Sequence, residues 1–217
     1  MKKKIDHALI ICNGEAPSRK LLLPLLRSKP FILCADGGAN KARSYGITPD
    51  CIIGDLDSIT PRTRHFFSSV PVIHIADQNS TDLEKGLEFL LSKRCRSAQI
   101  VGAMGERPDH TMANFSILMK YHRRLSLQFL DERCMVEIIR KKIRFSAAIG
   151  QQISLVPMNK CTGIVTTGLR YPLRRETLQP GVREGSSNEA VKETVTISLA
   201  HGSLLLFRIQ PTGTASL

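Results

Sequence analysis

Short apolar segments alternate with helix-forming segments along the first 130 residues of this 217-residue chain. This alternation constrains the fold more than any other feature, because strands joined by helices favour right-handed crossovers in a mostly parallel sheet. The expected strands are 8–12, 31–35, 51–53, 72–75 and 99–101. The expected helices are 18–27, 39–45, 61–67, 81–91 and 110–121. The sequence therefore predicts an α/β domain.

After about Arg140 the pattern changes to short strand-like segments separated by Gly, Pro and Asn, without a helix pattern. These segments are 151–156, 163–167, 194–199 and 203–209. We therefore expect a small all-β sandwich at residues 140–217 after an α/β domain at residues 1–135, with the boundary near 131–145. The polar segment 179–187 is expected to be an exposed, mobile loop.

Composition narrows the class of protein further. Hydrophobic residues make up 42% of the chain, enough for a packed core, and no apolar run reaches the roughly 18 residues of a membrane span. The N-terminal residues contain no signal-peptide cleavage site. The six cysteines are scattered singly, without the C-x-x-C spacing of zinc or redox sites. We expect a cytoplasmic protein with reduced cysteines and no membrane partner.

The formal net charge of +12 allows a nucleic-acid-binding function, because Lys and Arg neutralise phosphates. However, the basic residues are spread over several short clusters, aromatic residues make up only 5%, and the chain lacks an aromatic RNA-binding motif. A solvated basic surface without a nucleic-acid partner is therefore expected. Its field would also attract a polyanion such as a nucleoside triphosphate.

The first polar cluster, Asp36-Gly37-Gly38-Ala39-Asn40, stands between a predicted strand and a predicted helix. Open α/β sheets bind ligands at such junctions. Paired glycines let the backbone approach a phosphate, and the helix N-terminus offers N–H groups to an anion. A purely structural Gly-Gly turn is the alternative.

Asp55 and Asp57 follow the next strand and are the most informative pair in the sequence. In an extended segment two residues this far apart face the same side, and their like charges destabilise each other unless a cation bridges them. Oxygen-only ligands favour Mg²⁺ or Mn²⁺ over zinc. The pair therefore predicts a divalent metal site, with a turn that caps the next helix as the alternative.

Two further clusters begin predicted helices. Asp82 and Lys85 lie on one side of a first helical turn, suited to a metal and a phosphate respectively or, alternatively, to a surface salt bridge. Arg107 offers a planar guanidinium to phosphate oxygens, and Asp109 is placed to orient Arg107 or His110. A lone histidine near a helix start is more often a surface or cap residue.

All four clusters follow strands of one domain and combine carboxylates, glycine-rich turns and cationic side chains. Together they match the requirements of phosphoryl transfer. The sequence lacks a P-loop, the protein-kinase motifs and G-x-G-x-x-G, which disfavours ordinary NTPases, protein kinases and Rossmann dehydrogenases.

The same clusters occur in the same order in thiamine pyrophosphokinases, which this chain resembles along nearly its whole length. The matching motifs are Asp36-Gly-Gly-Ala-Asn40, Asp50-x-x-x-Gly-Asp-x-Asp-Ser58, Thr81-Asp-x-x-Lys85, Gly105-x-Arg-x-Asp-His110, Gly168-Leu-Arg-Tyr-Pro-Leu173 and Gly185-Ser-Ser-Asn-Glu189. The resemblance implies a nucleotide- and metal-binding α/β domain, a thiamine-binding β-sandwich, and a homodimer with active sites between subunits. The implied reaction converts ATP and thiamine to AMP and thiamine diphosphate.

The resemblance also implies residue roles. Mg²⁺ or Mn²⁺ is held by Asp55, Asp57 and Asp82, and Lys85 and Arg107 complete the catalytic set. The implied nucleotide-binding residues are Asp36, Gly37, Gly38, Asn40, Thr81, Asp109 and His110. The implied thiamine-binding residues are Gln78, Tyr171 as the stacking aromatic, and Ser187 and Asn188 as partners of the aminopyrimidine.

Three features depart from the family pattern. Glu106 stands where the family usually has a second glycine, Asn79 stands where some relatives have Asp, and Tyr171-Pro172 differs in the aromatic segment. The acceptor alcohol depends on the less specific C-terminal motifs, so another heterocyclic alcohol is the alternative substrate.

Overall fold

The computed structural model describes residues 5–15, 17–105 and 107–210. The chain divides into two compact units, Met1–Glu132 and Arg133–Leu217. The division falls between Glu132 and Arg133. Glu106, one of the departures noted above, lies outside the described residues.

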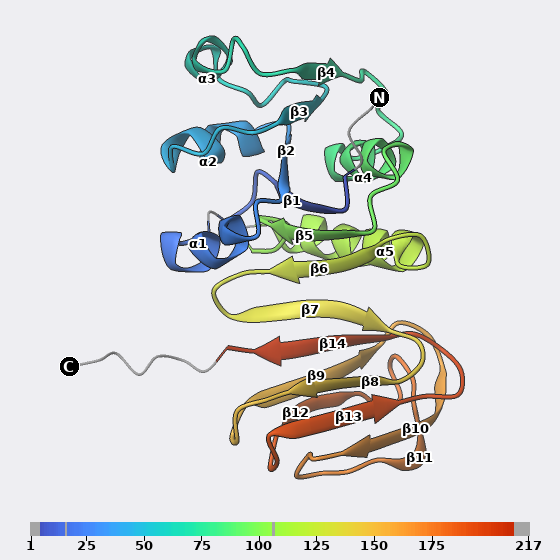
Figure 1. Cartoon of the computed structure of the whole chain (residues 1–217). Helices are drawn as coiled ribbons and strands as arrows, with labels where there is room; N and C mark the ends of the chain where they lie inside the picture. Colours follow the sequence, from blue (N-terminus) through green and yellow to red (C-terminus); the bar gives the residue numbers. More distant parts are fainter. Residues whose placement is uncertain (1–4, 16, 106, 211–217) are drawn as a thin grey trace, which may run out of the picture. The chain divides into compact units, whose positions relative to one another are not determined.

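Six parallel strands form the sheet of the first unit (Figure 1). Within that unit their order is β6-β5-β1-β2-β3-β4. The strands are β1 (His7–Ile11), β2 (Phe31–Ala35), β3 (Cys51–Gly54), β4 (Val72–His74), β5 (Ser97–Val101) and β6 (Ser126–Leu130). Leu9, Ile10 and Leu33 are fully buried, as expected for parallel strands covered on both faces.

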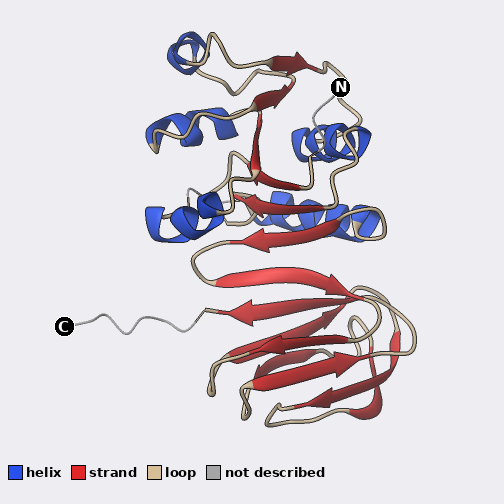
Figure 2. Ribbon diagram, in the orientation of Figure 1, coloured by secondary structure: helices blue, strands red, loops and turns tan. Residues whose placement is uncertain are grey.

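Five helices connect these strands. They are α1 (Arg19–Arg27), α2 (Gly38–Ser44), α3 (Pro61–Phe66), α4 (Asp82–Ser92) and α5 (Pro108–Tyr121). In Figure 2, helices lie on both sides of the sheet; the labels of Figure 1 show α1, α2 and α3 on one side and α4 and α5 on the other. The predicted α/β fold is confirmed. No described helix is long and apolar enough to cross a membrane.

The strand order contains a reversal beside β1. The chain runs outward from β1 through β2, β3 and β4, and then returns to place β5 on the opposite side of β1. The chain segments that leave β1 and β5 therefore run in opposite directions along the sheet. The carboxyl ends of these two strands form a topological switch point, which is where open α/β sheets bind ligands.

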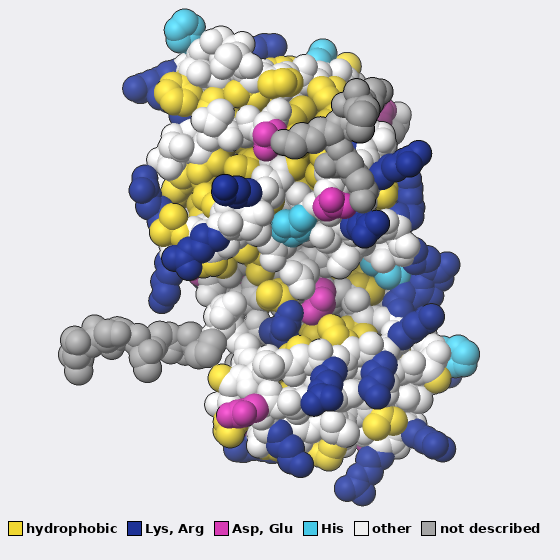
Figure 3. All heavy atoms as spheres, in the orientation of Figure 1, with side chains coloured by type: hydrophobic (Ala, Val, Ile, Leu, Met, Phe, Trp, Pro, Cys, Tyr) yellow, Lys and Arg dark blue, Asp and Glu magenta, His cyan; other side chains and the backbone are white. Residues whose placement is uncertain are grey.

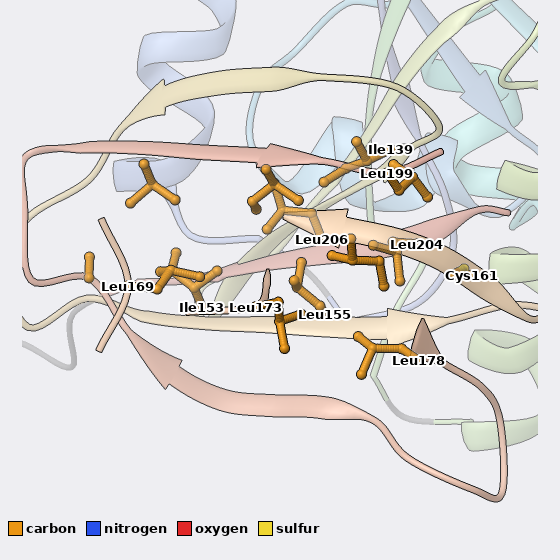
Figure 4. Packing of buried hydrophobic residues seen from close by; sticks show 14 of the residues in the cluster. Ile139, Ile153, Leu155, Cys161, Leu169, Leu173, Leu178, Leu199, Leu204 and Leu206 are labelled. Atoms are coloured by element: carbon orange, nitrogen blue, oxygen red, sulfur yellow. The ribbon is translucent and has the colours of Figure 1, made fainter. Parts of the chain in front are cut away.

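The second unit consists of antiparallel strands. They are β7 (Cys134–Ile139), β8 (Ile143–Ser146), β9 (Gln152–Pro157), β10 (Cys161–Thr167), β11 (Arg174–Leu178), β12 (Gly185–Glu189), β13 (Thr194–Ser198) and β14 (Leu204–Ile209). One layer has the order β12-β9-β14-β7 and the other β11-β10-β13-β8. Ile153 and Leu206 of the first layer share one apolar cluster with Ile164 and Ile197 of the second, and Figure 4 shows part of this core. The predicted β-sandwich is confirmed.

One sequence expectation in this unit is corrected. The segment 179–187 is predicted as an exposed loop. Residues 179–184 do form a turn, with a bridge between Gln179 and Arg183, but Gly185–Glu189 forms strand β12 and pairs with β9. This strand has a polar sequence because it lies at the edge of its layer and buries little, so apolar alternation cannot reveal it.

Candidate active site

A pocket of about 570 Å³ opens at the carboxyl ends of the strands of the first unit. It is lined by the segments that follow β1, β2, β3 and β5 and by the first turns of α4 and α5. Its volume is within the range of small-molecule sites. The pocket therefore occupies the switch point and brings together residues from all four predicted clusters.

Three carboxylates meet at this edge of the sheet. One ligand oxygen from each of Asp36, Asp55 and Asp57 lies within 4.8 Å of the other two. Leu56 has a φ of 68°, so Asp55 and Asp57 converge in a left-handed turn and not along the extended segment that the sequence argument assumes. Strain of this kind at a non-glycine residue is typical of functional sites.

Asp36 is the buried member of the group. Only 4% of its surface is exposed. Its Oδ2 accepts a hydrogen bond from the backbone N–H of Ser58 at 3.1 Å, whereas its buried Oδ1 has no hydrogen-bond partner among the described residues. Burial raises the pKa of Asp36 above its usual range.

The other two carboxylates are more accessible. Asp55 accepts a hydrogen bond from Nε2 of Gln78 at 3.3 Å and from the backbone N–H of Asp57 at 3.4 Å. The hydrogen bond from Asp57 is the main reason that the pKa of Asp55 is lowered. Oδ1 of Asp57 accepts from the hydroxyl of Ser58 at 2.9 Å.

This donor set fits a hard divalent cation. A buried carboxylate oxygen without a partner is unfavourable, and it becomes favourable when a cation supplies the missing contact. The three side chains offer only oxygen, which suits Mg²⁺ or Mn²⁺. Asp82, the third metal ligand implied by the family resemblance, is not part of this described cluster.

Asp82 instead pairs with a buried lysine. Its Oδ1 lies 2.9 Å from Nζ of Lys85, whose side chain is 3% exposed, and it also accepts from the backbone N–H of Asp55 at 3.3 Å. Both side chains line the pocket. An ammonium group has three donors, and Asp82 uses one of them. Lys85 therefore keeps donors and positive charge for an anionic ligand in the pocket.

The first turn of α4 is held in place by its own cap. The hydroxyl of Thr81 accepts from the backbone N–H of Glu84, and a carboxylate oxygen of Glu84 accepts from the backbone N–H of Thr81, each at 3.2 Å. This is a capping box. Thr81 thus fixes the position from which Asp82 and Lys85 project.

Arg107 and Asp109 form a two-point ion pair at the start of α5. Nε of Arg107 donates to Oδ1 of Asp109 at 3.1 Å, and a terminal nitrogen donates to Oδ2. The guanidinium lowers the pKa of Asp109 to about 2. Arg107 and His110 line the pocket, whereas Asp109 does not.

The glycine pair and Asn40 lie beside the pocket without lining it. A Cβ on Gly38 would be 1.9 Å from the carbonyl oxygen of Ile11, so this glycine permits close packing of α2 on β1. The side chain of Asn40 donates to the carbonyl of Ser58 at 2.8 Å and accepts from the backbone N–H of Thr60 at 3.1 Å. These residues shape the turn that carries the carboxylates.

Sequence reasoning missed several pocket residues. Asn13 and Gly14 follow β1 and line the pocket beside the switch point. An Asn-Gly pair directly after the first strand is the signal that could have found them. Ser58 ends one of the family motifs without a predicted role, yet its backbone N–H donates to Asp36 and its hydroxyl donates to Asp57.

Tyr171, Ser187 and Asn188 come together in the second unit. The side-chain oxygen of Asn188 accepts from the backbone N–H of Tyr171 at 3.1 Å, and its Nδ2 donates to the carbonyl of Tyr171 at 2.7 Å. Tyr171 is 66% exposed. Ser187 has a φ of 58° and donates its backbone N–H to Oγ of Ser154 at 3.0 Å. The amide of Asn188 therefore fixes the backbone that displays the tyrosine ring.

Charge on the visible surface is mostly basic. Figure 3 shows Lys and Arg side chains scattered over one face of both units, with few Asp and Glu among them. The acidic cluster in the pocket therefore contrasts with a basic surface, which would attract polyanions toward the protein.

The chain matches two family models. Residues 22–129 match the model described as thiamin pyrophosphokinase, catalytic domain, and residues 138–204 match the model described as thiamin pyrophosphokinase, vitamin B1 binding domain. Together they cover most of both units.

Individual relatives agree with these models. The thiamine pyrophosphokinase of Bacillus subtilis is 29% identical over 185 residues, covering 80% of this chain and 84% of the relative. Thiamine pyrophosphokinase 1 of rice, Oryza sativa, is 28% identical over 223 residues, and the match covers 88% of this chain and 83% of the relative. The structure of thiamin pyrophosphokinase from Candida albicans has a TM-score of 0.86 at 18% identity, covering 95% of this chain and 90% of that one, and shares the fold. The chain therefore belongs to the thiamine pyrophosphokinase family, whose enzymes transfer a pyrophosphoryl group from ATP to thiamine.

Proposed function

We propose that the pocket of the first unit binds the triphosphate of ATP with a divalent cation, and that the second unit supplies the thiamine contacts. The observation that carries this proposal is a pocket of nucleotide size lined by Asp36, Asp55 and the buried Lys85. Asp57 lies beside this lining, with a carboxylate oxygen within 4.8 Å of one from each of Asp36 and Asp55. Carboxylates for a cation next to a fixed ammonium group match the needs of a triphosphate.

Asp55 and Asp57 hold the cation, Mg²⁺ or Mn²⁺, at the end of β3. When bound, the ion neutralises charge on the triphosphate and lowers the barrier to attack. Gln78 lies next to this centre, since its amide donates to Asp55. Gln78 thus orients that carboxylate and stands beside the position of the reacting alcohol.

Lys85 and Arg107 supply the remaining positive charge. Asp82 fixes the ammonium group of Lys85, and Asp109 fixes the guanidinium of Arg107. Donors held in place before the reaction stabilise developing charge without reorganisation. Thr81 contributes by capping α4, while His110 lines the same pocket as a further polar contact for the nucleotide.

In the transfer, the thiamine hydroxyl oxygen forms a bond to the β-phosphorus of ATP while the bond from that phosphorus to the bridging oxygen of AMP breaks. The hydroxyl proton passes to a carboxylate of the pocket or to water, and AMP leaves with the electron pair of the broken bond. A primary alcohol is a weak nucleophile, so positioning and charge neutralisation account for most of the acceleration.

Thiamine recognition falls to the second unit in this proposal. Tyr171 presents an exposed ring for stacking on the substrate, held by Asn188. Ser187 is exposed beside them. In keeping with the family resemblance, the working form is a homodimer with active sites at the subunit interface, which light scattering of the purified chain will test.

The deciding experiment incubates the purified protein with ATP, MgCl₂ and thiamine and separates the nucleotide products. We expect AMP and thiamine diphosphate in equal amounts. Release of ADP would refute pyrophosphoryl transfer. A parallel assay with other heterocyclic primary alcohols tests the acceptor, and faster turnover with one of them would replace thiamine in the proposal while leaving the cation and triphosphate sites in place.

A further inference from the structure

We infer that Glu84 and Lys120 are positioning residues for Lys85, because together they fix the start of α4, from which the Lys85 ammonium group reaches the pocket. Neither Glu84 nor Lys120 is among the described residues that line the pocket. Both would therefore act on the reaction through other residues and not by contact with a substrate. The inference rests on the proposed function, in which Lys85 binds the triphosphate.

Glu84 uses both of its carboxylate oxygens. Oε2 accepts a hydrogen bond from the backbone N–H of Thr81 at 3.2 Å, which is one half of the capping box of α4. Oε1 accepts from Nζ of Lys120 at 2.7 Å. The Glu84 side chain is only 12% exposed, and hydrogen bonds between charged groups are strong where water is partly excluded. Lys120 therefore keeps the Glu84 carboxylate in the orientation that caps the helix.

Lys120 projects from a firmly held part of α5. Leu118 and Tyr121, on either side of it in sequence, are buried. Nζ of Lys120 lies 5.4 Å from the centroid of the Tyr121 ring, within the range of a cation–π contact. Earlier in α5, Nδ2 of Asn114 donates to the carbonyl of Ala103 at 2.7 Å. Since α5 is anchored in this way, Lys120 connects the start of α4 to a fixed support.

The start of α4 needs such support because the chain reaches it through an exposed segment. Residues 76–79 and Thr81 are exposed, and the first N–H groups of a helix have no partners within the helix. Leu83 is buried in the first turn, but its apolar contacts have no preferred direction. The hydrogen bonds of Glu84 supply the direction, and Asp82 and Lys85 project from the same turn. Small displacements of groups that bind a reacting substrate lower the rate strongly.

The protein contains a matched ion pair that lacks this connection to the cap. Glu88, one turn after Glu84 in α4, accepts from two nitrogens of Arg124 at 3.0 and 3.3 Å. The Arg124 guanidinium also lies over the ring of Tyr121, at 5.8 Å from the centroid. Glu88 is in the middle of α4 and takes no part in its capping box. Substitutions of Glu88 and Arg124 therefore remove a similar interaction without disturbing the start of the helix.

The kinetic test compares the two pairs in the full-length enzyme. We expect Lys120→Met to lower kcat/KM for ATP by about threefold and Glu84→Met by about tenfold, since Glu84→Met also removes half of the capping box. KM for thiamine should stay near normal. Lys120→Arg, which keeps the charge, should retain most of the rate. Because Lys120 acts through Glu84, the double variant should be no worse than Glu84→Met alone.

Glu88→Met and Arg124→Met are the controls. Arg124→Met should lower the melting temperature about as much as Lys120→Met, because each variant removes one ion pair. Both controls should leave kcat/KM for ATP near normal. Equal losses of kcat/KM in Lys120→Met and Arg124→Met would overturn the inference, because the two pairs would then act only on stability.

Hydrogen exchange measured by mass spectrometry tests the positioning without any reaction. In the protein without nucleotide, Glu84→Met and Lys120→Met should speed exchange in the peptide that contains the first turn of α4, whereas Glu88→Met should not. Unchanged exchange there in Glu84→Met would contradict the inference. If the unchanged protein releases no AMP while exchange follows the expected order, the proposed function is wrong and the positioning of the α4 start stands. If AMP is released and both Glu84→Met and Lys120→Met keep normal kcat/KM for ATP, the reaction stands and the positioning role is wrong.

Discussion

The polar side chains of the two units have different bonding partners. In the first unit, polar side chains lie at the ends of parallel strands and converge on a pocket, where one oxygen of Asp36 has no hydrogen-bond partner within the described part of the chain. In the second unit, Asn188 uses both ends of its amide on the backbone of Tyr171. The first arrangement leaves bonding capacity for a ligand, whereas the second fixes the shape of a surface. We therefore expect substitutions in the first unit to affect the chemical step and those in the second to affect substrate binding.

The largest effect should come from the carboxylates. Asp55→Asn or Asp57→Asn should lower kcat by about 10³-fold, because each keeps the shape of the side chain but loses a charged ligand. The melting temperature should change little, since both side chains are accessible. Asp6→Asn, which removes an exposed carboxylate from the same unit, is the control. A variant at Asp55 or Asp57 with near-normal turnover would exclude a metal role for that residue.

Lys85→Met should have the next largest effect, lowering kcat/KM for ATP by about 10²-fold. The methionine retains the buried chain but removes the ammonium group that faces the pocket. Lys93→Met, which removes a lysine at the other end of α4, is the matched control and should leave kcat/KM for ATP near normal. Equal losses in the two variants would show that overall charge matters more than the position of Lys85.

Tyr171→Ala and Asn188→Ala should each raise KM for thiamine by about tenfold, the equivalent of one aromatic contact, with little change in KM for ATP. Since Asn188 acts through Tyr171, the double variant should be no worse than Tyr171→Ala alone. Steady-state kinetics with thiamine varied at saturating ATP measures this. Additive losses would instead indicate that Asn188 contacts the substrate directly.

The smallest effect concerns the ion pair of Arg107. This guanidinium favours the charged form of Asp109 and lowers its pKa to about 2, so the pair persists as pH falls through the usual carboxyl range and is lost only near pH 2. In Arg107→Met the Asp109 midpoint should rise toward the ordinary value of about 4. Carboxyl ¹³C NMR of both proteins gives the two midpoints directly. An unchanged midpoint would mean that Asp109 does not orient Arg107.

Much of the first unit could be predicted because its signals are local. Apolar runs and helix-start residues lie next to each other in sequence, and all five predicted helices are present at nearly the expected bounds. In the second unit, apolar alternation reveals the inner strands such as β9 and β14. It does not reveal the polar edge strand β12, which is defined by pairing with β9 and not by its own composition.

The candidate site divides in the same way. The motifs identify which segments carry carboxylates and cations, and the structure brings Asp55, Gln78, Asp82 and Lys85 to one pocket. The motifs do not reveal that Asn40 bonds to the turn at Ser58 or that Gly38 lets α2 pack closely on β1. Both roles depend on contacts with residues far away in the sequence, Ser58 and Ile11.

The sequence by itself determined that this chain folds as an α/β unit followed by a β unit, and that its acidic and basic clusters follow parallel strands, because both properties depend on residues close together in the chain. Only the tertiary structure decided which carboxylates meet. Asp36 reaches Asp55 and Asp57 because β2 pairs with β3, and Asp82 is bonded instead to Lys85. Such pairings depend on strand order and on the donors that surround each side chain, and neither is encoded in local spacing.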